Sequence, residues 1–138
     1  MYRLSIVTPD RIFYEGEISS LTAPGSVGYL GVLTGHAPLL TPLAAGKLSF
    51  RDSSGKNLLA ALSGGFLEVS PKGALVLADS IEFPNEIDRA RCEKAAERAR
   101  QRLTKNEGVD IPRAAAGLKR AENRLSVLEE AVAAGQQE

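Results

Sequence analysis

The chain divides into two segments whose compositions favour different kinds of structure. Residues 1–84 hold all seven aromatic residues, ten of the thirteen glycines and six of the seven prolines, but only 13 charged side chains. Residues 85–138 hold 21 charged side chains and eleven alanines, with no aromatic residue and one proline. The first composition is typical of strands and turns, and the second of long exposed helices. We therefore predict two domains, 1–84 and 85–138.

The charge balance and the few reactive residues exclude several classes of protein. The 17 Lys and Arg are matched by 17 Asp and Glu, whereas nucleic-acid-binding domains usually carry a basic excess. No apolar run approaches the roughly 18–20 residues that cross a bilayer, and the N-terminal sequence lacks the pattern of a secretory signal. One cysteine excludes an internal disulfide, and one histidine excludes a His/Cys metal cluster. We expect a soluble, intracellular protein that binds neither nucleic acid nor metal.

Residues 1–84 are predicted to form short strands separated by glycine and proline turn signals, such as Ser63-Gly64-Gly65. Many short strands at regular spacing favour an antiparallel β-sandwich or barrel. Apolar and polar residues alternate in Phe66–Ser70, but Ala74–Leu77 is apolar on both faces. The predicted strands are Tyr2–Val7, Ile12–Tyr14, Ile18–Ala23, Lys47–Arg51, Asn57–Leu62, Phe66–Val69 and Ala74–Ala78.

A first helix is predicted to begin just after the boundary. Asn85 is a suitable N-cap, because Glu86 and Asp88 then lie in the first turn, where carboxylates suit the positive end of the helix. The helix is expected to run to about Lys105. Asn106-Glu107-Gly108 supplies its C-terminal stop.

A second helix is predicted from a cap at Asp110, with Pro112 in its first turn, to about Ala133. The short connection makes the two helices antiparallel neighbours. Their predicted contact seam consists mostly of small residues, which bury little apolar area, so the hairpin is only marginally stable alone and should dock on something. The seam residues are Cys92, Ala96, Ala99 and Leu103 on the first helix and Leu118, Ala121, Leu125, Leu128 and Val132 on the second.

Both predicted helices carry like-charged side chains one turn apart. Lys94, Arg98 and Arg102 form one ladder, and Arg120 and Arg124 form another. Like charges at this spacing repel by about 0.2–0.5 kcal/mol per pair. The pattern therefore suggests an external anion, either a polyphosphate or an acidic stretch of a partner protein. A simpler interpretation is a solvated charged face screened by salt.

No set of residues assembles into an active site. The glycines from Gly25 to Gly35 match neither a dinucleotide-binding motif nor a P-loop. His36 has no neighbouring cysteine or carboxylate in the sequence to orient it, and Cys92 occupies a seam position. The residues indicate a binding or coupling protein rather than an enzyme.

Four stretches of the sequence resemble the epsilon subunit family of bacterial F-type ATP synthases. The most specific is Gly31-Val32-Leu33-Thr34-Gly35-His36-Ala37-Pro38-Leu39-Leu40-Thr41, which is similar to the family signature L-G-I-x-P-G-H-A-P-L-L-T. The others are Ser5-Ile6-Val7-Thr8-Pro9-Asp10, Ser63-Gly64-Gly65-Phe66-Leu67-Glu68-Val69 and Ile87-Asp88. The resemblance covers essentially the whole chain, in the right order.

The resemblance implies a ten-stranded β-sandwich followed by a two-helix hairpin in the central rotor stalk. The sandwich would bind the gamma subunit and sit on the ring of c subunits, coupling the ring to gamma during proton-driven ATP synthesis. The hairpin would reach the catalytic head of alpha and beta subunits and inhibit ATP hydrolysis when extended. The chain would be a non-catalytic subunit, peripheral at the cytoplasmic face of the cell membrane through its complex.

In several bacterial members of this family the folded hairpin binds ATP as a regulatory ligand, while no cofactor is required. The family motif I/L-D-x-x-R-A appears here as Ile87 to Cys92, with cysteine in place of the last alanine. By resemblance, Ile87 and Asp88 would contact the adenine and Arg91 the ribose or phosphates. Others would contact the phosphates or lie near the nucleotide: Arg98, Arg120, Arg124 and Glu82.

The loop before the signature departs from the family. Many members read S-x-E-G-E-L-G-I, whereas here Val27 and Tyr29 replace both acidic residues and Thr34 replaces a usual proline. Acidic residues of this loop contact the c-ring in other members. A charged contact is therefore not expected here, although Tyr29 could supply packing and a hydroxyl hydrogen bond. The predicted c-ring and gamma contact residues are Tyr29, Leu30, Gly31, Gly35, His36 and Pro38.

Two other functions stay compatible with these residues. A structural adaptor would dock its hairpin without inhibiting hydrolysis. A stand-alone nucleotide sensor would bind ATP through the same arginines and have no affinity for gamma.

Overall fold

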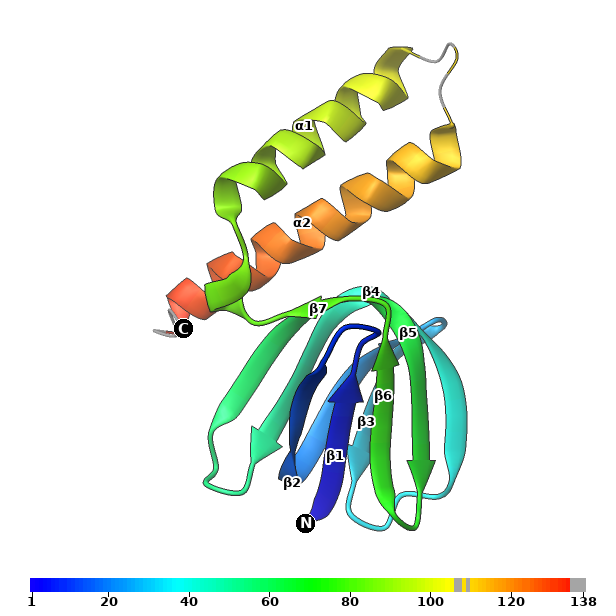
Figure 1. The fold of residues 1–138 in the computed structure, drawn as a ribbon, viewed down its shortest axis with the longest axis vertical. Coiled ribbons are helices and arrows are strands. Elements are labelled where there is room, and N and C mark those ends of the chain that lie inside the picture. Colours follow the sequence, from blue (N-terminus) through cyan, green and yellow to red (C-terminus); the bar gives the residue numbers. More distant parts are fainter. Residues whose placement is uncertain (106–107, 109, 135–138) are drawn as a thin grey trace. The chain divides into compact units, whose positions relative to one another are not determined.

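The computed structural model describes residues 1–105, 108 and 110–134 (Figure 1). The chain separates into two compact units, Met1–Glu82 and Phe83–Glu138. The first unit is built from strands and the second from helices. Each unit is described by itself below.

The first unit is one sheet of seven strands that closes on itself (Figure 1). Its strand order is β1-β6-β5-β4-β2-β3, and an additional pairing of β1 with β2 completes the closure. β3 continues the sheet beyond β2, and β7 pairs with β5. The strands are β1 (Tyr2–Val7), β2 (Ile12–Gly25), β3 (Gly28–Leu33), β4 (Leu39–Asp52), β5 (Asn57–Ser70), β6 (Gly73–Ala78) and β7 (Ile81–Glu82).

The expected β domain followed by two helices is confirmed, but the expected ten antiparallel strands are not. The described residues form seven strands, and the β1–β6 pair is parallel. Two pairs of predicted strands run together, in β2 and in β5, and β4 extends well beyond the predicted Lys47–Arg51; each of the three strands is 14 residues long. The ladder between β1 and β2 runs unbroken from Tyr14 to Ile18, across the break that had been predicted between two strands.

The predicted turn at Ser63-Gly64-Gly65 lies inside β5. Both glycines have positive φ, 109° at Gly64 and 146° at Gly65. A Cβ atom at Gly65 would collide with the backbone oxygen of Leu77 on β6. These glycines therefore bend a continuous strand and let β6 approach closely, rather than reversing the chain.

The core of this unit is made of large aliphatic side chains that alternate along the strands. Among the described residues, the ten largest side chains that are almost wholly buried include nine that belong to the sheet. Because neighbouring residues of a strand point to opposite faces, one face of each strand fills the interior. These nine are Leu4, Ile6, Ile18, Leu21, Val32, Leu48, Leu62, Leu67 and Val76.

The second unit begins with a short 3₁₀ helix, η1 (Pro84–Glu86), and then the helix α1 (Arg89–Lys105). The predicted N-cap at Asn85 is wrong, because Asn85 lies in the 3₁₀ turn and the next residue but one, Ile87, is extended. Asp88 caps α1 instead, its Oδ1 accepting a hydrogen bond of 3.1 Å from the backbone N–H of Arg91.

The helix α2 (Ile111–Ala133) has the predicted bounds and cap. The Oδ1 atom of Asp110 accepts a hydrogen bond of 3.1 Å from the backbone N–H of Arg113, and Pro112 lies in the first turn. Gly108 has a φ of 63°, which suits a helix stop. Asn106 and Glu107 of the predicted stop lie outside the described residues.

The seam prediction is correct for three of the four residues on α1, where Leu103 is only half-buried, and less complete for α2. Cys92, Ala96 and Ala99 are buried on α1. On α2 Ala121 is buried, but Val132 is 53% exposed and the three predicted leucines are only half-buried. Ala114, Val127 and Ala131 are also buried on α2, although they are not among the predicted seam residues.

Candidate functional site

One ion pair fixes which side chains share a face of the hairpin. A guanidinium nitrogen of Arg100 on α1 lies 3.6 Å from a carboxylate oxygen of Glu122 on α2, so both side chains lie on one side of the hairpin. Residues two positions apart on a helix point about 200° apart. The neighbours of this pair at that spacing therefore occupy the opposite side. They are Arg98 and Arg102 on α1 and Arg120 and Arg124 on α2.

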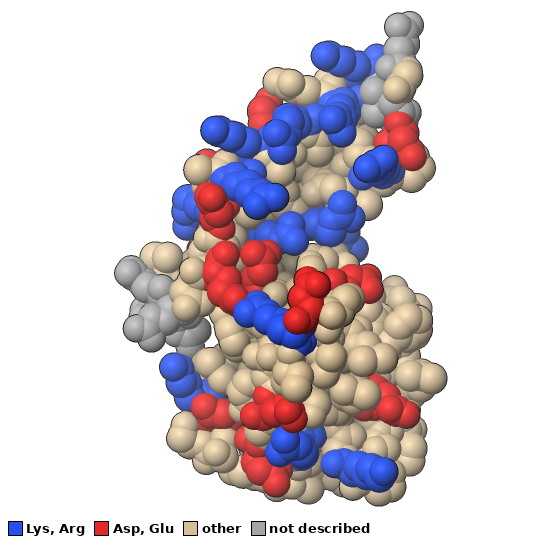
Figure 2. Space-filling view, in the orientation of Figure 1, with Lys and Arg blue, Asp and Glu red and all other residues tan. Residues whose placement is uncertain are grey.

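Two more arginines extend this surface, because residues seven apart on a helix return to nearly the same side. Arg91 lies seven residues before Arg98, and Arg113 lies seven before Arg120. We call the whole surface the basic face. Lys and Arg predominate over the helical unit in the view of Figure 2. The basic face consists of Arg91, Arg98, Arg102, Arg113, Arg120 and Arg124.

Carboxylates are segregated to the other side of the hairpin. Glu97 lies 3.6 Å from Arg100, beside Glu122. Glu93 lies one turn before Glu97, and Glu129 lies two turns after Glu122. Four of the five carboxylates within α1 and α2 are therefore separated from the basic face by the helices themselves.

The arginines of the basic face form three successive rungs across the two helices. At the tip, Arg102 and Arg113 line one hollow of about 440 Å³. Because the helices are antiparallel, each step back along α1 matches a step forward along α2. Arg91 and Arg124, each eleven residues from the tip pair, then lie at about one level, and Arg98 and Arg120, four and seven residues from it, are offset by about 4.5 Å.

The outer surface of the sheet carries a second candidate site that the sequence prediction missed. In register, Ile12 pairs with Val7, Val7 with Leu77, Leu77 with Phe66 and Phe66 with Pro42. This apolar row crosses five strands on the outer surface, and Ile12, Phe66 and Leu77 are each more than half exposed. The signal in the sequence was the stretch Ala74–Leu77, which is apolar on both faces.

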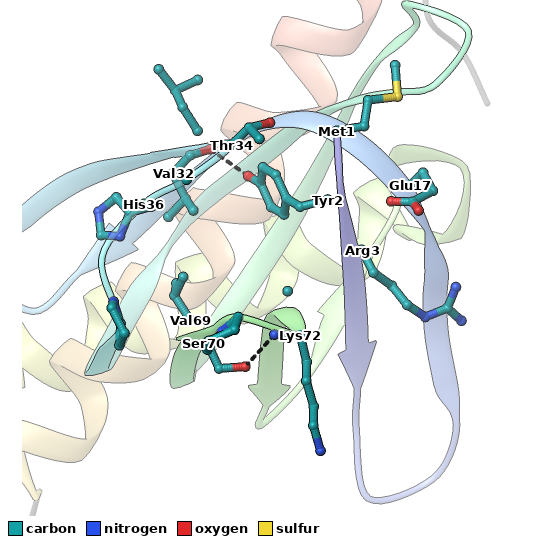
Figure 3. A pocket seen from close by; sticks show the side chains of 15 residues that line it. Met1, Tyr2, Arg3, Glu17, Val32, Thr34, His36, Val69, Ser70 and Lys72 are labelled. Carbon is teal, nitrogen blue, oxygen red and sulfur yellow. Dashed lines mark hydrogen bonds between the residues drawn. The ribbon is translucent and has the colours of Figure 1, made fainter.

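The predicted contact loop is divided between two places. Gly35, His36 and Pro38 line a cleft of about 550 Å³ at the start of β1. In Figure 3 Tyr2, Val32 and Val69 gather around this cleft, while Arg3 and Lys72 extend away from it.

Tyr2 connects β1 to the end of β3 beside this cleft. Its hydroxyl donates a hydrogen bond of 2.5 Å to the backbone oxygen of Val32 (Figure 3). Partial burial raises the pKa of Tyr2 from 10.0 to about 12, because the phenolate is poorly solvated there. The hydroxyl therefore stays a donor throughout the physiological range.

Tyr29 lies at the other end of β3, with Leu30 and Gly31 following it in the strand. Its hydroxyl accepts a hydrogen bond of 3.0 Å from the backbone N–H of Lys47. Gly46 makes room for it, because a Cβ there would lie 2.9 Å from the Tyr29 hydroxyl and 2.7 Å from Pro24. The ring stays 60% exposed, so its outer surface is open to a partner.

Comparison with known proteins identifies both halves of the chain. Residues 1–84 match the family model of the ATP synthase delta/epsilon chain beta-sandwich domain, and residues 85–129 match that of the long alpha-helix domain of the same chain. The chain belongs to the ATP synthase delta/epsilon family.

Curated members of the delta/epsilon family align over most of their length. The ATP synthase epsilon chain of Moorella thermoacetica is 46% identical over 123 residues, which are 88% of this chain and 92% of the relative. The epsilon chain of Clostridium kluyveri is 40% identical over 126 residues, 91% and 96% of the two chains. The epsilon chain of Syntrophomonas wolfei is 42% identical over 129 residues, 93% and 94% of the two.

Solved structures of ATP synthases have the same fold. A chain of the Euglena gracilis mitochondrial ATP synthase OSCP/F1/c-ring has a TM-score of 0.69 and 26% identity, covering 98% of this chain and 81% of its own. A chain of the Tetrahymena thermophila central stalk and c-ring has a TM-score of 0.58 at 16% identity, which supports the fold alone. None of the helices described here is long and apolar enough to cross a membrane.

The nucleotide residues expected for an epsilon family member are only partly brought together. Ile87 is buried and extended just before α1, and Asp88 is the cap of that helix, so one of its carboxylate oxygens is engaged. The four arginines belong to the two rungs of the basic face farthest from the tip. Glu82 lies in β7 and so belongs to the other compact unit.

Proposed function

We propose that this chain is the epsilon subunit of a bacterial F-type ATP synthase. It acts as a non-catalytic part of the central stalk that couples the c-ring to the gamma subunit during proton-driven ATP synthesis. The observation that carries this proposal is the match of both family domains, in order, over residues 1–129. Its place would be peripheral, at the cytoplasmic face of the cell membrane.

The apolar row is the proposed surface for the gamma subunit. A contiguous apolar patch on a water-soluble surface is typical of a protein interface. The row crosses the long strands β2, β4 and β5. A partner bound there would rest on strands whose inner face is packed with large aliphatic side chains. Leu40, which is 70% exposed two residues before Pro42, widens the row on β4.

The contact loop is the proposed surface for the c-ring. Tyr29 presents an exposed aromatic ring, and its hydroxyl lies close to Gly46, which is next to Pro24. Tyrosine supplies apolar contact area at little cost in side-chain entropy. Since the Tyr29 hydroxyl already accepts a bond from Lys47, we expect the ring surface to provide most of this contact.

The hairpin is the proposed regulatory element, which inhibits ATP hydrolysis when it reaches the alpha and beta subunits of the catalytic head. ATP bound at Arg91, Arg98, Arg120 and Arg124 would favour the folded hairpin. An acidic segment of the beta subunit would compete for the same cations. Such competition supplies the difference in affinity between two states that a ligand-driven switch requires.

The test measures ATP hydrolysis by a catalytic head that contains gamma but lacks this subunit. The full chain, or a chain stopped after Pro84, is added. Inhibition by the full chain alone supports the regulatory hairpin, whereas binding of both forms to gamma without inhibition supports a structural adaptor. If neither form binds gamma, the proposed function is wrong.

Two double variants, each with a control, test which surface binds gamma and which binds ATP. Phe66→Glu with Leu77→Glu should abolish gamma binding, while Val27→Glu, which adds a charge at an exposed apolar turn residue outside the row, should not. Arg98→Ala with Arg120→Ala should abolish ATP binding to the isolated chain. Arg89→Ala with Lys119→Ala removes the same charge from elsewhere on the hairpin and should leave ATP binding unchanged.

A further inference from the structure

The basic face is longer than the proposed nucleotide site. That site uses Arg91, Arg98, Arg120 and Arg124, and it leaves out the rung formed by Arg102 and Arg113 at the tip. These two arginines line a hollow together with Gly108, Asp110 and Ala114. The function proposed above gives this third rung no role.

The length of the face exceeds that of a triphosphate. Arg91 and Arg102 are eleven residues apart, so they are separated by about 17 Å along the axis of α1. A triphosphate has only three phosphorus atoms, joined by two bridging oxygens, and covers only part of that length. A longer chain, with charge along its whole length, can lie beside all three rungs.

The width of the face favours a slender ligand. Packed helices lie about 8–10 Å apart, and the alanines buried in this seam favour a close approach. An α-helix with its side chains is about 10–12 Å wide, so it would rest on the arginine rows rather than enter between them. An extended chain can lie lengthwise between the rows and receive hydrogen bonds from both helices.

The chemistry of the face favours phosphate over an extended acidic peptide. A guanidinium group has five N–H donors and no acceptor, and its planar fork matches the oxygens of a phosphate. A phosphate chain carries only acceptors, so every contact with the rungs is favourable. A peptide would also bring backbone N–H donors, which a guanidinium group cannot accept.

We propose that the basic face binds linear inorganic polyphosphate, with the chain lying lengthwise along the three rungs. Arg102 and Arg113 extend the site past the nucleotide and give it a preference for longer chains. The site shares four arginines with the proposed ATP site. It does not rest on ATP binding, because its distinguishing rung lies outside that set.

Calorimetric titration of the full chain with ATP, inorganic triphosphate and a linear polyphosphate of several tens of phosphates tests this proposal. Polyphosphate should bind more tightly than triphosphate. Arg102→Ala with Arg113→Ala should weaken polyphosphate binding by about tenfold, as expected for two lost charge-assisted contacts, and change ATP binding by less than about twofold. The matched control, Arg89→Ala with Lys119→Ala, should change neither by more than about twofold.

Four outcomes would overturn the proposal. These are equal affinity for triphosphate and polyphosphate, equal losses in the tip variant and the control, poly-glutamate binding as tightly as polyphosphate, and no polyphosphate binding at all. ATP binding separates this proposal from the function proposed above. If polyphosphate binds and ATP does not, the inference stands and the nucleotide site fails; the reverse result removes the inference alone.

Discussion

The two units of this chain are stabilised by side chains of very different size. The sheet buries leucine, isoleucine and valine on every long strand, whereas the buried residues of α1 are Cys92, Ala96 and Ala99. Each fully buried large aliphatic side chain contributes about 1.5–3 kcal/mol, and an alanine much less. The sheet is therefore suited to be a fixed scaffold, and the hairpin to be an element whose state depends on what it binds.

The largest expected effect is a loss of stability in the sheet unit. Leu48 is fully buried on β4, and Leu48→Ala should lower the free energy of unfolding by about 2–5 kcal/mol, through lost apolar contact and the cavity that remains. Denaturant unfolding monitored by tyrosine fluorescence measures this, because all three tyrosines lie in the sheet unit. Ala96→Gly on α1 is the contrasting change and should cost about 1 kcal/mol of helix stability. A tyrosine transition that shifts equally in both variants would contradict the separation of the units.

The next effect tests where the hairpin begins. Asp88→Ala removes the N-cap of α1 and should cost about 1 kcal/mol, seen as lower helical content in far-ultraviolet circular dichroism and a lower helical unfolding midpoint. Asn85→Ala is the matched control at the cap that the sequence pattern favoured. We expect it to change neither quantity. A larger loss of helical content from Asn85→Ala than from Asp88→Ala would show that Asn85 is the N-cap, as the sequence pattern predicted.

These two positions also show how far the sequence could predict the structure. The helix pattern predicted α2 correctly, because Asp110 and Pro112 are local signals with one consistent interpretation. At the start of α1, Asn85 and Asp88 are both good caps, and the choice depends on Ile87, which is buried in an extended conformation. Burial of that kind is a tertiary effect, which a local pattern does not contain.

The sheet shows the same limit over longer distances. The predicted strand Tyr2–Val7 agrees with the structure. Ser63-Gly64-Gly65 was predicted as a turn, because glycine permits positive φ both in turns and in bent strands. The apolar row was missed because its members come from five strands, and only the register brings them together. The arginine ladders were predictable from spacing alone, but their union on one face needed the Arg100–Glu122 pair.

A smaller effect concerns the link between β1 and β3. Burial raises the pKa of Tyr2 from 10.0 to about 12, so its neutral form is favoured in the folded state. The stabilisation is present below pH 10 and is lost as the pH rises toward about 12. Tyr2→Phe should cost about 1 kcal/mol near neutral pH, for one lost hydrogen bond. It should also remove an ionisation near pH 12 from an absorbance titration. An unchanged titration would contradict the raised pKa of Tyr2.

The smallest expected effect concerns the ion pair between the two helices of the hairpin. Arg100 and Glu122 join α1 to α2 across 3.6 Å, with about half of each side chain exposed. Glu122→Gln should therefore destabilise the hairpin by only about 0.2–1 kcal/mol, less at high salt. Glu129→Gln, on the same side of α2, is the control for the charge change. Because the pair lies opposite the basic face, Glu122→Gln should weaken hairpin folding without weakening anion binding to the folded form. If it instead altered anion affinity as strongly as Arg98→Ala does, the two sides of the hairpin would not be separate surfaces, and the three-rung arrangement would be wrong.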